Sequence, residues 1–168
     1  MKVITAPEDI YQYSDVSCFL AGGITNCPEW QDEIIEKLKD TEEGVLYNPR
    51  RKNFPMEDPN AASEQIKWEF EALAKADVFS MWYSNADSDQ PICMYELGRN
   101  LAIRSAENQL NRVCIGVEPG YRRAQDVEIQ TALVSPSIQI VSTIEEHTKN
   151  LVKVMNDIAN EKLNSVWR

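Results

Sequence analysis

The sequence predicts an α/β protein of the flavodoxin-like class, a three-layer sandwich in which helices cover both faces of a five-stranded parallel sheet. Two observations support this prediction. Short, unbroken apolar runs alternate along the chain with longer stretches of helical periodicity, which is typical of a parallel sheet buried on both faces. The length of 168 residues and the hydrophobic content of 43% suit one continuous core. We therefore expect a single domain over residues 1–168.

Five apolar runs that are rich in branched and aromatic residues predict the strands. They lie at residues 17–21, 44–48, 77–83, 112–117 and 138–142. Because crossovers between parallel strands are right-handed, few topologies remain. We expect the strand order 2-1-3-4-5.

Five helices are predicted between and after these strands. The first begins near Pro28, and its apolar stripe consists of Trp30, Ile34 and Leu38. The second covers residues 61–76, with an expected inner face of Ile66, Phe70 and Leu73. Pro91 opens the third, and the fourth covers residues 123–133. The last begins at Thr143 and Glu146, which have the spacing of a capping box.

The charge of the chain restricts its partners. A formal net charge of -10 repels polyphosphate chains, so we expect neither a nucleic acid nor a membrane as partner. The apolar runs are far shorter than the ~20 residues that span a bilayer. The N-terminus lacks the apolar stretch of a signal peptide. We expect a cytoplasmic protein that acts on a small molecule.

Metal and cofactor chemistry have little support in the sequence. The four cysteines lie far apart, without a Cys-x-x-Cys pair. The only histidine, His147, lies in the polar stretch 145–149, which is typical of a solvated helix face. The full Gly-x-Gly-x-x-Gly pattern of dinucleotide-binding folds is absent. We expect no metal and no cofactor.

A binding site is expected at the carboxyl ends of the strands, at the point where the strand order reverses. This point lies between the first and third predicted strands, which are followed by the loops 22–27 and 84–90 respectively. The loop after the second strand carries Arg50 and Arg51 and can close over them. The two glycines that end the first strand let a ligand approach the backbone, or they make only a tight turn.

Glu96 is the candidate nucleophile. It lies in the second turn of the third helix, where the helix dipole favours an ionised carboxylate. If Leu97 and Leu101 face the sheet, Glu96 points towards the strand ends. The alternative is an ordinary glutamate that complements the dipole.

With no second histidine, acid–base chemistry falls to carboxylates. Those expected near the crevice are Asp77, Asp87, Asp89 and Glu96, with Glu69 as a further candidate. Glu69 lies on the flank of the second helix that also carries Gln65. Its alternative role is that of a surface charge or salt-bridge partner.

Five segments, in this order, resemble the nucleoside 2-deoxyribosyltransferase-like family. They are FLAGGI at 19–24, NPRR at 48–51, QIKWE at 65–69, ADVFSMWY at 76–83 and PICMYELG at 91–98. The resemblance implies a nucleoside or nucleotide substrate and a Glu96 that attacks the anomeric carbon. The chemistry parallels that of a retaining glycosidase, which forms a covalent glycosyl-enzyme intermediate.

The resemblance also suggests roles for other residues. Asp77 or Asp89 would assist departure of the base, and Tyr83 and Trp82 would stack on it, unless Trp82 belongs to the core. Arg50 and Arg51 would hold a 5-phosphate, or they neutralise the acidic surface. The remaining residues expected to bind substrate are Gly22, Gly23, Ile24, Glu69 and Gln90.

Two positions depart from the transferase pattern. Many transferases have an aspartate six residues before the nucleophile, where this chain has Gln90, and a tyrosine in the first strand, where it has Phe19. Hydrolysis is therefore an alternative to transfer. A non-catalytic nucleotide-binding module and cleavage of NAD stay open as well. The resemblance further implies a homo-oligomer, with the C-terminal residues 165–168 at an interface.

Overall fold

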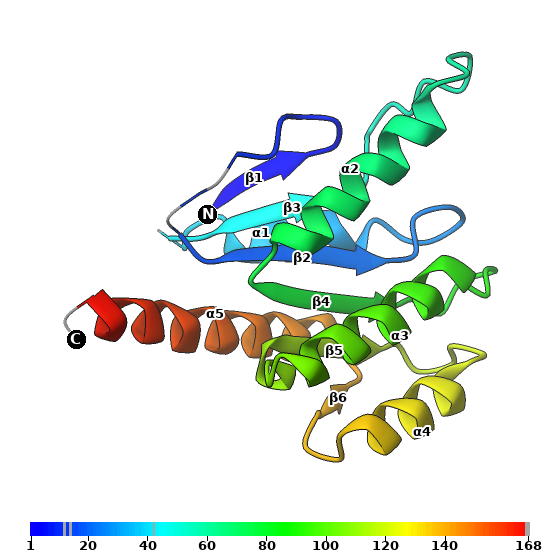
Figure 1. The fold of residues 1–168 in the computed structure, drawn as a ribbon. Helices are drawn as coiled ribbons and strands as arrows, with labels where there is room; N and C mark the ends of the chain where they lie inside the picture. The colour runs from blue at the N-terminus through cyan, green and yellow to red at the C-terminus, as the bar shows by residue number, and fades with distance from the viewer. Residues whose placement is uncertain (12, 14, 42, 167–168) are drawn as a thin grey trace.

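The computed structural model describes residues 1–11, 13, 15–41 and 43–166. Residues 165 and 166 are described by their backbone alone. The C-terminal segment expected at an interface, residues 165–168, has no described side chains. One parallel sheet of six strands, in the order β1-β3-β2-β4-β5-β6, forms the centre of the molecule (Figure 1). The strands are β1 Lys2–Thr5, β2 Ser17–Gly22, β3 Val45–Asn48, β4 Val78–Tyr83, β5 Val113–Val117 and β6 Ile140–Val141.

The predicted order is confirmed for the five predicted strands, which correspond to β3-β2-β4-β5-β6. The predicted number of strands was wrong, because β1 adds an edge strand that pairs with β3. β1 has four residues, and only Ile4 among them is fully buried. An edge strand exposed on this scale leaves no continuous apolar run in the sequence.

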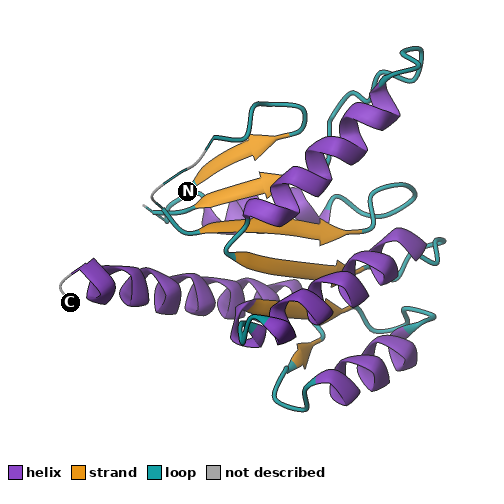
Figure 2. Cartoon of the chain, in the orientation of Figure 1, coloured by secondary structure: helices purple, strands orange, loops and turns teal. Residues whose placement is uncertain are grey.

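Five α-helices surround the sheet (Figure 2). They are α1 Trp30–Leu38, α2 Ala61–Lys75, α3 Pro91–Ala106, α4 Ala124–Val134 and α5 Ile144–Val166. Two separate apolar cores lie on the two faces of the sheet: α1 and α5 pack on one face, and α2, α3 and α4 on the other. This is the predicted three-layer, flavodoxin-like arrangement. Within the described residues, no helix is both long and apolar enough to cross a membrane.

The expected inner face of α2 was wrong in part. Leu73 is buried, but Ile66 and Phe70 are 66% and 56% exposed. The helix instead turns Trp68 and Ala72 into the core. The Trp68 ring lies 6.3 Å from that of Phe19, and its indole Nε1 donates a hydrogen bond to the Glu8 carbonyl. Burying the larger tryptophan surface outweighs burying the Ile66 and Phe70 stripe.

His147 is not on a solvated face. Its ring is fully buried, with Nε2 2.7 Å from the Ser80 hydroxyl and the ring centroid 5.5 Å from that of Trp82. The charged neighbours of His147 in sequence occupy the outer side of α5. His147 and Leu151 are four residues apart and share the inner side. Half of the expected capping box begins this helix: the Glu146 amide donates to Thr143 Oγ1 at 3.2 Å, but the Glu146 carboxylate accepts from the Thr143 hydroxyl at 3.0 Å in place of the backbone amide.

Candidate active site

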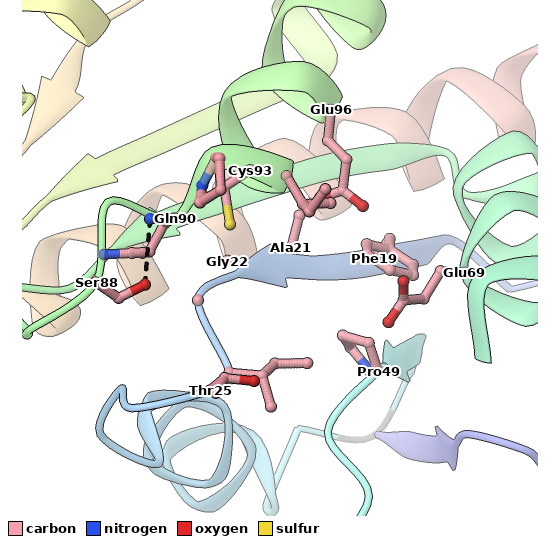
Figure 3. A pocket seen from close by; sticks show the side chains of 14 residues that line it. Phe19, Ala21, Gly22, Thr25, Pro49, Glu69, Ser88, Gln90, Cys93 and Glu96 are labelled. Carbon is pink, nitrogen blue, oxygen red and sulfur yellow. Dashed lines mark hydrogen bonds between the residues drawn. The ribbon is translucent and has the colours of Figure 1, made fainter. Parts of the chain in front are cut away.

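A cavity of about 320 Å³ opens at the carboxyl edge of the sheet, between β2 and the start of α3. This is the switch point that the strand order predicts. Of the residues expected at the site, six line the cavity: Gly22, Gly23, Ile24, Glu69, Gln90 and Glu96. Side chains from α2 and α3 reach it from one side, and the loop after β2 forms the other (Figure 3).

Glu96 projects from the second turn of α3 into this cavity (Figure 3). The expected orientation of the helix is confirmed, because Leu97 and Leu101 are both buried against the sheet. Burial, followed by the charge of Glu69, raises the Glu96 pKa to about 7, whereas Arg99 lowers it. The shift is opposite to the one expected from the helix dipole, because loss of water and a second carboxylate outweigh the dipole here.

Glu69 lines the same cavity but comes from α2, whereas Glu96 comes from α3 (Figure 3). The Gln65 side-chain amide donates to Glu69 Oε1 at 2.7 Å and to the Pro49 carbonyl at 2.7 Å, which fixes the position of the carboxylate. Burial raises the pKa of Glu69, although Gln65 and Arg51 oppose the shift. Two half-buried carboxyl groups with raised pKa values thus share one cavity, an arrangement that favours one shared proton.

Close packing requires glycine at the end of β2, at Gly22, and at the next position, Gly23. A Cβ on Gly22 would lie 2.4 Å from the Trp30 ring, and a Cβ on Gly23 would lie 2.4 Å from Cys27 Sγ. The Gly23 backbone therefore forms the cavity wall at a place that no side chain fits.

Gln90 joins the loop after β4 to the start of α3. It is 4% exposed and has a left-handed backbone conformation with φ of 48°. Its side-chain amide donates to the Ser84 carbonyl at 2.8 Å, and its backbone amide donates to the Ser88 hydroxyl at 3.2 Å. A neutral amide, and not a carboxylate, therefore occupies this part of the cavity wall.

Asp77 lies at the opposite edge of the sheet. It directly precedes β4, and the start of a parallel strand lies far from the carboxyl ends. Its carboxylate accepts hydrogen bonds from the Ser17 amide at 2.9 Å and from Lys162 Nζ at 3.1 Å. Asp89 lies at the correct edge, but its side chain is 56% exposed and pairs with Arg122 at 3.4 Å. The structure thus brings neither aspartate into the cavity.

The aromatic residues at the end of β4 belong to the core. Tyr83 is fully buried, its hydroxyl donates to the Cys93 carbonyl at 3.1 Å, and its ring stacks on Tyr121 with centroids 5.0 Å apart. Trp82 packs on His147. Tyr83 thus supports α3, whereas Trp82 lies on the opposite face of the sheet against α5. Neither residue lines the cavity.

The adjacent arginines have different environments. Arg50 crosses to the loop after β2 and to α1: its Nη2 donates to the Pro28 carbonyl at 2.7 Å, and its Nε donates to Gln31 of α1 at 2.8 Å. Both arginines line a second cavity, which shares Ile24 with the first. Neither arginine lines the cavity of Glu96.

Ile92 and Cys93 line the cavity but were not anticipated from the sequence. Thr25 and Ser88 lie in the loops 22–27 and 84–90 that were expected at the site, although neither was named as a site residue. Cys93 lies three residues before Glu96, so helical spacing alone places the two side chains on the same face. Ser88 and Thr25 lie on loops, where spacing offers no comparable guide.

The fold and this cavity define an α/β protein with a paired-carboxylate pocket at the switch point of its sheet. Residues 15–117 match the family model described as nucleoside 2-deoxyribosyltransferase like. The chain belongs to this family. Comparison with curated proteins finds no match.

Proposed function

We propose that this protein cleaves or exchanges the N-glycosidic bond of a deoxyribonucleoside or its 5-monophosphate, with Glu96 as the nucleophile. One observation carries the proposal: two half-buried carboxyl groups, Glu96 and Glu69, share a cavity at the carboxyl edge of the sheet, and burial raises the pKa of each. Membership of the nucleoside 2-deoxyribosyltransferase-like family supports it.

In the first step, a Glu96 oxygen forms a bond to the anomeric carbon as the carbon–nitrogen bond to the base breaks. The bonding electron pair leaves with the base, and a proton from the Glu69 carboxyl group neutralises it. The product is an ester between the sugar and Glu96. Burial raises the pKa of Glu69, which helps this group to hold the single proton of the pair when Glu96 is the ionised member.

In the second step, water or a second base attacks the same carbon, and the bond to Glu96 breaks. Glu69, now ionised, accepts the proton of the attacking group. Glu96 returns as a carboxylate, so protons and electrons balance over the cycle. Water as the attacking group gives hydrolysis, and a second base gives transfer.

Glu69 takes the acid–base role that the sequence suggested for Asp77 or Asp89. Asp77 is bound to Ser17 and Lys162 at the amino edge, and Asp89 is paired with Arg122 at the surface. Glu69 is held by Gln65 within the cavity.

Free base, followed by chromatography after incubation with deoxynucleosides and their monophosphates, tests this proposal. We expect release from the wild type, loss of release in Glu96→Gln, and full release in Glu64→Gln, an exposed glutamate on α2. A second added base distinguishes exchange from hydrolysis. Ligand binding without release by the wild type would indicate a binding module, and an active Glu96→Gln variant would exclude Glu96 as nucleophile.

We also propose a homo-oligomer in which a second copy covers the outer side of α2 and α3. Large side chains exposed there are Ile66, Phe70, Ile92, Tyr95 and Ile103, which we call the α2–α3 patch. Ile92 also lines the cavity, so the patch continues to its mouth. A second copy seated there would shield the two carboxyl groups from water.

A further inference from the structure

The proposed mechanism needs one particular distribution of the shared proton, with Glu96 ionised and Glu69 protonated. The two carboxyl groups alone do not favour this distribution. Burial raises the pKa of both, and the charge of Glu69 raises that of Glu96 further. A cation placed next to Glu96 would favour the productive form, because an opposite charge stabilises an ionised carboxylate.

Arg99 lies three residues after Glu96 on α3, a spacing that brings two side chains together on one face of a helix. Its guanidinium carbon lies 4.4 Å from the ring centroid of Phe70 on α2. Arg99 also lines the groove between these two helices, together with Leu73 and Asn100. A cation–π contact with one helix and attachment to the other thus hold this charge beside the carboxyl pair.

The charge of Arg99 is not neutralised by a direct partner. In the part of the chain that the structure describes, Arg99 forms no ion pair with a carboxylate. It nevertheless lowers the pKa of Glu96, against the effects of burial and of Glu69. Glu96 is therefore the carboxyl group on which this cation acts.

The other ionisable groups that interact with Glu96 among the described residues do not supply such a charge. They are Glu69 on α2, Tyr83 on β4 and Cys93 on α3. Burial, with a smaller effect of Glu96, raises the pKa of Cys93 to about 12 and that of Tyr83 far above its usual range. Both stay neutral near pH 7, so Glu69 contributes a negative charge and Arg99 a positive one.

Glu69 interacts with a different cation. Arg51, in the loop after β3, lowers the pKa of Glu69, and so does the hydrogen bond from Gln65. Arg51 thus favours the unproductive distribution, in which Glu69 is ionised and the proton lies on Glu96. The two arginines act on the shared proton in opposite directions.

Resting on the proposed function, we propose that Arg99 is a positioning residue for the shared proton: its cation stabilises ionised Glu96, so that the proton of the pair lies on Glu69. Arg99 does not line the cavity of Glu96. It therefore acts through Glu96 and does not contact the sugar or the base.

The dependence of kcat/KM on pH tests this role in wild type, Arg99→Gln, Arg99→Lys and the exposed control Arg123→Gln, which removes the same charge elsewhere. Without the cation, Glu96 holds the proton more tightly. Arg99→Gln should therefore lower the maximal kcat/KM by about tenfold and move its fall above pH 7 to higher pH by about one unit. Arg99→Lys keeps the charge and should retain most of the maximum, and Arg123→Gln should match the wild type.

Carbon-13 NMR of the glutamate carboxyl groups measures the proton distribution without turnover, with the two signals assigned by their loss in Glu96→Gln and Glu69→Gln. We expect Glu96 to titrate near pH 7 in the wild type. Arg99→Gln should raise this midpoint by about one unit, whereas Arg51→Gln should raise mainly the midpoint of Glu69.

An unmoved Glu96 midpoint in Arg99→Gln would overturn the proposal, even if activity falls, because the loss would then be structural. A shifted midpoint with an unchanged maximal kcat/KM would overturn it as well, since ionisation of Glu96 would not limit the reaction. Equal shifts in Arg99→Gln and Arg123→Gln would point to net charge instead. If no substrate loses its base while the Glu96 midpoint moves in Arg99→Gln alone, the proposed activity fails and the action of Arg99 on the pair stands.

Discussion

At the scale of single residues, ionising both carboxyl groups in one cavity costs free energy, because two negative charges then lie close together. Burial and Glu69 together raise the Glu96 pKa to about 7. A nucleophile must be ionised, whereas the acid that assists the leaving base must be protonated. A pair that shares one proton near neutral pH meets both requirements at once.

This pairing predicts the pH dependence of activity. Because the active pair carries one proton, which is released at the Glu96 pKa of about 7, kcat/KM should fall as the pH rises through about 7. Glu69→Gln removes the second carboxylate and with it this requirement. The kcat/KM of the variant should depend only on ionisation of Glu96, at a pKa lower than in the wild type, and should not fall above pH 7. The same change should lower kcat by about 10²- to 10⁴-fold, the range of general acid catalysis. A Glu69→Gln profile that still falls above pH 7 would argue against a proton shared by the two groups.

Two glycines allow a matched comparison of packing. A Cβ on Gly23 would meet Cys27 Sγ at 2.4 Å and Gln90 Oε1 at 2.6 Å, whereas one on Gly98 meets nothing within 4 Å. Gly23→Ala should displace the cavity wall and lower kcat/KM by about 10²-fold. Gly98→Ala, in the interior of α3, should raise the free energy of unfolding by about 0.5–1 kcal/mol. Steady-state kinetics and urea unfolding of both variants test the pair, and equal effects would contradict it.

At the scale of elements, the spacing of apolar residues predicts which helices and strands exist, and in what order, better than it predicts which face of a helix is buried. The runs that became β2 to β6 are continuous, and right-handed crossovers limit their order, so the sheet could be derived. For α2, Ile66 with Phe70 and Trp68 with Ala72 both have four-residue spacing, and only the packing partners of Trp68 decide between them. Spacing along one helix does not show what faces it.

The candidate site follows the same division. Glu96 could be predicted because its helix start and the switch point are both visible in the sequence. Asp77 lies away from the site because it precedes β4, and a residue before a parallel strand lies at the amino edge of the sheet. The hydrogen bonds that hold Glu69 and occupy Arg50 join separate segments of the chain, and spacing carries no information on such contacts.

At the scale of the whole molecule, His147 links stability to pH. Burial lowers its pKa from 6.5 to about 4, so the native state keeps it neutral while the unfolded chain takes up a proton below pH 6.5. Its contribution is fully present above pH 6.5 and is lost as the pH falls towards 4. We expect a loss of about 2 kcal/mol between pH 7 and pH 5. Urea unfolding measures it, and His147→Gln should show a correspondingly weaker pH dependence over that range.

The α2–α3 patch predicts the state of assembly. Phe70→Glu places a charge in the patch, so it should convert an oligomer to monomers in light scattering. Leu133→Glu, on the exposed side of α4, is the control and should leave the mass unchanged. A wild-type monomer at the concentrations used for activity would contradict the proposed assembly.

The Arg50 guanidinium donates hydrogen bonds to four oxygen atoms, three in the loop after β2 and one in α1. They fasten the segments after β2 and β3 to each other before any ligand arrives. The conformational entropy of ordering this edge is therefore lost during folding and not during association. A substrate meets a rigid wall on that side, and the affinity it gains there is not reduced by a loop that must first become ordered.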